Sequence, residues 1–99
     1  MGKNEVIEIV RKYKEAVLSK IDGPVTVYLY GSYSRGKAHS GSDIDVAVVV
    51  PEVKDDFLTA SSLLWSLTWD VSTLIEPVLI DARYPSPLYS SILSSGIAV

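Results

Sequence analysis

Apolar residues recur at steps of three and four through the first twenty positions of the chain. This spacing places them on one helical face and predicts an amphipathic helix over residues 4–20, with Asn4 as its N-cap. The stripe consists of Val6, Ile9, Val10, Tyr13, Val17 and Ile21. Asp22, Gly23 and Pro24 then end the helix ahead of a strand.

Runs rich in β-branched and aromatic residues predict three strands, at residues 25–30, 44–50 and 71–80. The second run is apolar at every position beyond Asp45, so we expect an interior strand that is covered on both faces. The third run contains Pro77, which lacks an N–H group and therefore restricts this strand to a sheet edge or a bulge.

Two further helices are predicted between and after these strands. One covers residues 52–68, with Pro51 suited to its first turn and with Val53, Phe57, Ala60, Leu64 and Leu67 along one apolar stripe. The other begins at Ser86 and Pro87, a typical N-cap and first helical position, and is closed by Gly96. This order of elements predicts the α/β (α+β) class, with a small mixed β-sheet and helices packed on it.

Length and composition narrow the classes of function. Ninety-nine residues predict a single domain over residues 1–99. The hydrophobic fraction of 47% against 21% charged residues excludes disorder and leaves more apolar surface than a small monomer hides, so we expect a homo- or hetero-oligomer. The net charge of −3 supplies no basic field, which argues against nucleic acid as the main partner. The absence of cysteine, of a basic-then-apolar leader and of a long apolar run predicts a cytoplasmic protein without a membrane span.

The segment between the first two strands carries candidate anion ligands. Gly31 can bring the backbone close to a ligand, and a short helix over residues 32–36 would aim free N–H groups at a phosphate. The hydroxyl and cationic side chains along this loop are Ser32, Ser34, Arg35, Lys37, Ser40 and Ser42. Arg35 is the preferred cation because its guanidinium can hold two phosphate oxygens, whereas Lys37 is a point charge. His39, a lone loop histidine, is left outside the predicted site.

Carboxylates are set into two of the predicted strands. Asp43 and Asp45 are two positions apart, so on a strand both side chains leave the same face and can converge on a hard cation such as magnesium. Glu76 lies in the middle of an otherwise apolar strand, which is a costly place for a carboxylate without a function. Asp70 and Asp81 are the rival candidates for a third ligand, although turn or capping aspartates are common at strand ends.

Trp65 and Trp69 lie away from the buried stripe of the predicted helix over residues 52–68. Such residues either complete the edge of a small core or form a contact with another subunit or partner.

The spacing of the loop and the carboxylates is itself informative. Gly31-Ser32, ten further residues and then Asp43-Ile44-Asp45 before an apolar run resemble the signature of the DNA polymerase beta-like nucleotidyltransferase superfamily. The later segment Ile75-Glu76-Pro77-Val78 strengthens the match. Within that superfamily, a chain this short resembles the minimal nucleotidyltransferases. The resemblance implies a polymerase beta palm-like fold and transfer of a nucleoside monophosphate, with AMP favoured, from a magnesium-bound triphosphate to a hydroxyl acceptor.

The resemblance also implies the roles of the candidate residues. Two Mg²⁺ ions would be held by Asp43, Asp45 and Glu76, although most relatives carry aspartate at the third position. Glu76 would also help to deprotonate the acceptor hydroxyl. The phosphates of ATP would be held by Gly31, Ser32, Arg35 and Ser42.

The implied partner is a helical protein of the HEPN type. In such pairs the transferase acts as an antitoxin by adenylylating its partner, and the acceptor here would be a tyrosine of that toxin. Two alternatives stay open: a noncatalytic antitoxin subunit that binds a nucleotide or a partner, and a small-molecule nucleotidyltransferase that modifies antibiotics.

Overall fold

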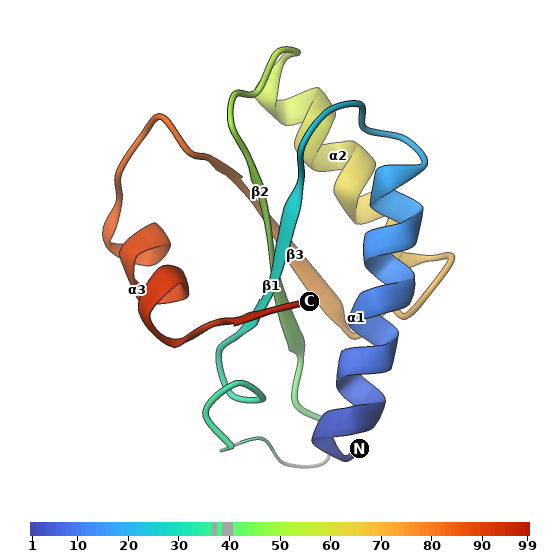
Figure 1. Cartoon of the computed structure of the whole chain (residues 1–99). Helices are drawn as coiled ribbons and strands as arrows, with labels where there is room; N and C mark the ends of the chain where they lie inside the picture. The colour runs from blue at the N-terminus through green and yellow to red at the C-terminus, as the bar shows by residue number, and fades with distance from the viewer. Residues whose placement is uncertain (37, 39–40) are drawn as a thin grey trace.

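A computed structural model describes residues 1–36, 38 and 41–99 of the chain. Lys37, His39 and Ser40, three of the loop residues considered above, lie outside the described residues. The elements along the chain are α1 (Lys3–Leu18), β1 (Thr26–Tyr30), β2 (Ile44–Val50), α2 (Phe57–Thr68), β3 (Ile75–Asp81), α3 (Pro87–Ser95) and β4 (Ile97–Ala98) (Figure 1). In the described part of the chain, no helix combines the length and apolar character that crossing a bilayer requires.

The strands form one mixed sheet in the order β3-β2-β1-β4. β1 and β2 are antiparallel, with Tyr30 opposite Asp45, whereas β2 and β3 are parallel, with Asp45 opposite Glu76. The prediction that β2 is an interior strand is confirmed, and its bounds are those predicted. β3 is the edge strand that Pro77 requires, because the proline needs no ladder partner on its outer side. The α/β class predicted from the sequence is therefore confirmed.

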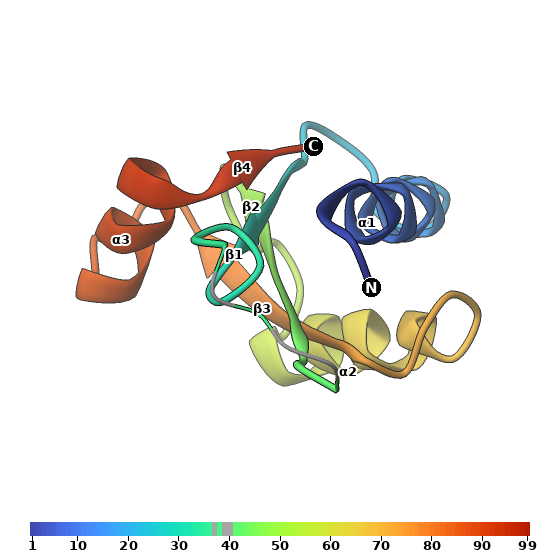
Figure 2. The same ribbon diagram turned by 90° about the horizontal axis from the view of Figure 1, so that it is seen from below.

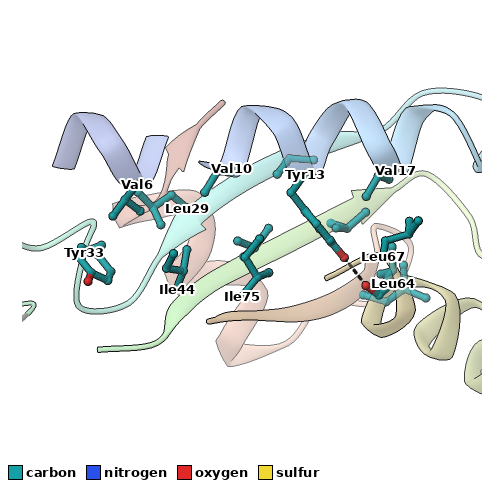
Figure 3. Close-up of a cluster of buried hydrophobic side chains, with 14 of the residues drawn as sticks. Val6, Val10, Tyr13, Val17, Leu29, Tyr33, Ile44, Leu64, Leu67 and Ile75 are labelled. Carbon is teal, nitrogen blue, oxygen red and sulfur yellow. Dashed lines mark hydrogen bonds between the residues drawn. The ribbon is translucent and has the colours of Figure 1, made fainter. Parts of the chain in front are cut away.

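The two faces of the sheet are covered by different helices (Figure 2). α1 and α2 cover one face, where the hydrophobic core contains Val46 and Val48 of β2. Figure 3 shows part of this core, including Val6 and Val10 of α1 and Leu29 of β1. The other face is covered by α3, whose Ile92 packs on Ala47 and Val49. Since successive strand residues point to opposite faces, the position of a residue in β2 decides which helix it meets.

α1 and α2 are joined by a buried hydrogen bond. The Tyr13 hydroxyl donates to the backbone carbonyl of Leu64 over 2.7 Å (Figure 3). The α1 stripe is buried at Val6, Val10, Tyr13 and Val17, as the periodicity predicts. The prediction that Asn4 is the N-cap is wrong, because the helix begins at Lys3 and Gly2 is the N-cap.

α2 is shorter than predicted. It begins at Phe57, and its N-cap is Asp56, whose carboxylate accepts from the Thr59 N–H at 3.0 Å. Pro51 does not begin this helix, and the Val53 N–H donates to the side chain of Asp81 at 3.0 Å. Of the predicted stripe, Leu64 and Leu67 are buried, whereas Phe57 is 49% exposed.

The C-terminal part of the sheet differs from the prediction in two ways. β3 begins at Ile75 because residues 69–74 form hydrogen-bonded turns after α2, including the bond from the Ile75 N–H to the Ser72 carbonyl. β4 was not predicted, because two residues are too few for a periodic pattern. α3 matches the prediction, with Ser86 as its N-cap and Gly96 as its C-cap.

Candidate active site

The carboxylates lie at the end of the sheet where β2 and β3 begin. Asp43 precedes β2, Asp45 is its second residue, and Glu76 is the second residue of β3. Parallel pairing places Glu76 opposite Asp45. Both side chains belong to the face that α3 covers farther along the strands, because they alternate in step with Ala47 and Val78. The fold thus brings together carboxylates from two strands that the whole of α2 separates in sequence.

The charges of these carboxylates act on one another. The pKa of Glu76 is raised, chiefly by the charge of Asp43, then by desolvation and by Asp45, and Asp43 is within side-chain hydrogen-bonding reach. The pKa of Asp45 is raised by desolvation and by Asp43, whereas the positive charge of Arg35 lowers it. Like charges held this close are unfavourable unless a cation or a proton neutralises them. The arrangement therefore favours the binding of positive charge.

The donor set fits a hard divalent cation, since carboxylate oxygens are the ligands that magnesium prefers. As the side chains lie, however, no three histidine, aspartate or glutamate side chains of the described residues form a group that could hold a metal ion. Asp43 and Glu76 are both exposed, so their side chains can change rotamer without disturbing the core. Coordination by all three carboxylates stays a prediction.

Gly31 is required by the approach of Asp45. Its φ of +74° lies in the left-handed region, and a Cβ at this position would be only 2.2 Å from Oδ2 of Asp45. A side chain at residue 31 would therefore strain the turn and displace the carboxylate. From the sequence this glycine could be assigned only to the approach of a ligand, whereas the structure shows that a side chain of the site itself occupies the space.

The predicted short helix over residues 32–36 is wrong. These residues form a turn in which the Arg35 N–H donates to the Gly31 carbonyl at 3.3 Å and the Ser34 hydroxyl donates to the same carbonyl at 2.9 Å. No helix N-terminus is therefore directed at a phosphate here. The Ser34 hydroxyl already donates within the turn.

The other predicted phosphate ligands lie close to the carboxylates. Arg35 is exposed, and its charge acts on Asp45. Ser42 is half-buried and immediately precedes Asp43 in the chain. Contacts of Ser32, Arg35 and Ser42 with phosphate stay predictions.

Two tyrosines contribute to the site although the sequence analysis did not select them. Tyr33 is buried in the core beneath α1, so it anchors the turn that carries Gly31 and Arg35 (Figure 3). Tyr30 is half-buried opposite Asp45, and its pKa is raised by desolvation and by the charges of Asp45 and Glu76. The signal for Tyr30 was its position at the end of the strand that delivers Gly31.

The rival carboxylates have other positions. Asp81 is opposite Val50 at the far end of β3, about 16 Å along the strand from Glu76. Its carboxylate accepts from the backbone N–H groups of Val53 and Arg83 and from the Arg83 guanidinium, which hold its pKa well below the usual range. Asp70 is exposed in the turn after α2. Neither is placed beside Asp45 by the strand register.

The chain is similar to known nucleotidyltransferases in sequence and in fold. Residues 10–95 match the nucleotidyltransferase domain family. A Methanocaldococcus jannaschii protein, named as a candidate protein adenylyltransferase, is 28% identical over 101 residues that cover 96% of this chain and 99% of that protein. The protein adenylyltransferase MntA of Shewanella oneidensis is 28% identical over 88 residues, or 87% of this chain. The matched part is only 55% of the length of MntA.

Solved structures share the fold. A nucleotidyltransferase candidate from Sulfolobus solfataricus superposes with a TM-score of 0.69 at 17% identity, over 97% of this chain and 80% of that one, which shows the fold alone. A mutant MntA-HpeT toxin-antitoxin complex contains a chain with a TM-score of 0.59 at 27% identity, over 100% of this chain and 72% of that one. A toxin-antitoxin structure with AMP-PNP contains a chain that superposes with a TM-score of 0.52 at 28% identity, over 99% of this chain and 72% of that one.

The family match runs from the middle of α1 to the end of α3 and includes the turn at Gly31 and all three carboxylates. The chain therefore belongs to the nucleotidyltransferase domain family, as a minimal nucleotidyltransferase of the DNA polymerase beta-like superfamily.

Proposed function

We propose that this enzyme transfers AMP from magnesium-bound ATP to a hydroxyl group of a partner protein, namely a tyrosine of a HEPN-type toxin. The observation that carries the proposal is the pairing of Asp45 with Glu76 on one sheet face, directly beside the turn at Gly31. Two relatives named as protein adenylyltransferases support the class of acceptor, and the toxin-antitoxin structure with AMP-PNP supports an adenine nucleotide.

In the proposed reaction, the tyrosine oxygen attacks the α-phosphorus of ATP. The bond from that phosphorus to the bridging oxygen of the β-phosphate breaks, so pyrophosphate leaves and AMP stays on the tyrosine. The phenol must lose its proton, and Glu76 is the proposed base. Its exposed position admits an acceptor, and its register opposite Asp45 places it beside the other carboxylates.

Asp43, Asp45 and Glu76 would hold two Mg²⁺ ions. When bound, these ions neutralise charge on the reacting phosphate and on the departing oxygen. The residues of the chain complete the site: Gly31 leaves room for the Asp45 carboxylate, and Ser32, Arg35 and Ser42 hold the β- and γ-phosphates. Arg35 is suited to this role because its cation stabilises negative charge on the pyrophosphate.

A labelling experiment tests the proposal. The chain is incubated with the candidate toxin, Mg²⁺ and ATP labelled either at the α- or at the γ-phosphate. We expect label in the toxin only from α-labelled ATP, and we expect Asp45→Asn to lower the rate about a hundredfold or more. Asp22→Asn is the matched control, because that carboxylate is exposed between α1 and β1 and lies outside the predicted site.

The same experiment separates the alternatives. Label from the γ-phosphate would contradict nucleotide transfer. Binding of ATP without transfer to the toxin would favour a noncatalytic antitoxin, and transfer only to an aminoglycoside hydroxyl would favour the small-molecule enzyme.

A further inference from the structure

An apolar stripe runs along the outer face of α2. Leu58, Ser62, Trp65 and Trp69 are separated by steps of four, three and four residues, which places them on one side of a helix with 3.6 residues per turn. Trp69 belongs to the stripe because its backbone, at the C-cap, is still helical. Leu58, Trp65 and Trp69 are 74%, 48% and 79% exposed. We call these four residues the outer stripe.

The outer stripe has no role in the core of the domain. α2 packs on the sheet through the opposite side of the helix, where Leu64 and Leu67 are buried. A tryptophan that becomes buried removes roughly 150–250 Å² from solvent. Two tryptophans and a leucine on one helical face therefore supply an apolar patch of the size that marks interaction sites on soluble proteins.

The charges at the ends of the stripe restrict what can cover it. α2 contains no charged residue, whereas Lys54, Asp55 and Asp56 precede it and Asp70 follows it; all four are exposed, so both ends carry net negative charge. Asp56 is used as the N-cap, but no described residue forms a hydrogen bond or ion pair with the side chain of Asp55 or Asp70. Asp70 also lies just beyond the negative end of the α2 dipole, where a cation is favoured.

A pocket beside the N-terminal end of α2 provides a place for such a cation. It has a volume of about 400 Å³, and its lining includes Asp55, Phe57 and Tyr84. Arg83, which also lines it, is already paired with Asp81. A long basic side chain from outside could lay its stem on Phe57 and place its charge near Asp55.

A second copy of this chain is a poor occupant of the stripe. Antiparallel packing of two outer stripes would bring Asp55 of one copy near Asp70 of the other, and parallel packing would bring each aspartate near its own equivalent. Both arrangements place like charges together at both ends of the contact, and the net charge of −3 adds to the repulsion.

We propose that the outer stripe of α2 docks a partner protein through an apolar helical face that carries arginine or lysine at both ends. The partner's apolar side chains cover Leu58, Trp65 and Trp69, and its two basic ends meet Asp55 and Asp70.

This docking surface is separate from the active site. α2 covers one sheet face, whereas Asp45 and Glu76 belong to the face that α3 covers (Figure 2). A partner held on α2 therefore leaves the carboxylates open. The proposal does not depend on nucleotide transfer, because it rests only on the apolar and acidic groups around α2.

Tryptophan fluorescence gives a direct test, because Trp65 and Trp69 are the only tryptophans in the chain. The probe is a synthetic amphipathic helical peptide with a leucine face and arginines at both ends, and the matched peptide carries glutamates at those ends. We expect a blue shift with the arginine peptide, weakened at high salt, and none with the glutamate peptide. Leu58→Ser keeps both reporters and should weaken binding about tenfold or more.

The control variant is Leu93→Ser, a 54% exposed leucine on α3, which should bind the peptide as the parent does. The Asp55→Asn, Asp70→Asn double variant should lose the preference for the arginine peptide while keeping its helical circular dichroism. Equal binding of both peptides by the parent, or binding of neither, overturns the proposal. So does sedimentation that shows a dimer of the parent chain which Leu58→Ser dissociates, since the occupant would then be a second copy.

Discussion

At the scale of single residues, the site depends on a position where no side chain fits. Gly31→Ala should reduce nucleotide transfer severely, because the added Cβ would meet Oδ2 of Asp45 at 2.2 Å, and should cost about 1–2 kcal/mol from the positive φ. Gly36→Ala is a matched control, since its φ is +69° and its Cβ would meet no heavy atom within 4 Å. The unfolding temperature should fall by a similar amount in both variants, whereas transfer activity should be lost only in Gly31→Ala. Equal activity loss in both would show that strain in the turn, and not displacement of Asp45, is responsible.

A substitution of Glu76 should separate the binding of ATP from the transfer of its nucleotide. Glu76→Gln should leave ATP binding largely intact, because the phosphate donors and Asp45 remain, but it should lose transfer because the proposed base and ligand is gone. Calorimetry with a nonhydrolysable nucleotide and the labelling assay measure the two effects. Transfer at the parent rate would remove Glu76 from the proposed mechanism.

Which residues of the site could be predicted depended on the reach of local patterns. Asp43 and Asp45 follow from strand alternation, and Glu76 follows from its isolation in an apolar strand. The role of Tyr33 could not be predicted, because burial of a loop aromatic depends on how the turn folds back beneath α1. The clash at Gly31 could not be predicted either, since it arises from the pairing of β1 with β2.

At the scale of elements, the bond between α1 and α2 carries a pH dependence. Burial raises the pKa of Tyr13 above its usual value. The protonated Tyr13 hydroxyl therefore contributes fully to stability below about pH 10, the usual pKa of tyrosine. This contribution is lost as the pH rises toward the higher pKa of the folded state. Tyr13→Phe should destabilise the protein by about 1 kcal/mol near neutral pH, because the bond to the Leu64 carbonyl is lost. The difference in unfolding temperature between parent and variant should shrink above pH 10, and a constant difference would contradict this account.

Asp81 gives the opposite pH dependence. Its lowered pKa means that its contribution to stability is present above about pH 4 and is lost as the pH falls toward the folded-state value. Asp81→Asn should therefore lower the unfolding temperature at neutral pH and flatten its decline in acid. An acid titration followed by circular dichroism measures both, and Asp22→Asn, in the exposed segment between α1 and β1, is the control.

Elements with strong local signals were predicted well. β2 has the predicted bounds because its apolar run is bordered by charged and turn residues, and α3 has a serine cap and a closing glycine that act locally. The start of α2 was misplaced because Pro51 and the acidic residues after it resemble a helix start, whereas the N-cap is formed by Asp56. β4 exists only because β1 offers a free edge to residues 97–98.

At the scale of the whole molecule, β4 closes the sheet edge at β1. The Val99 N–H donates to the Val27 carbonyl at 2.9 Å, and Lys14 of α1 donates to the Val99 carbonyl at 2.7 Å. Deleting residues 97–99 should lower the unfolding temperature and cause concentration-dependent association, because β1 would present unpaired backbone groups. Light scattering during thermal unfolding measures both effects. Unchanged scattering would show that the exposed edge of β1 does not cause association between molecules.

The pairing of Asp45 with Glu76 also sets the order in which the site can form. β1 and β2 are neighbours in sequence, so the contact of Gly31 with Asp45 closes only a short loop. Glu76 reaches Asp45 only after α2 has formed and β3 has docked in parallel, which closes a longer loop at a greater entropic cost. During folding we therefore expect the half of the site around Gly31 to be made first and the carboxylate of β3 to arrive last. Because a nucleotide needs both halves of the site, it would bind only molecules in which the sheet is complete. Nucleotide binding would therefore distinguish fully folded molecules from partly folded ones.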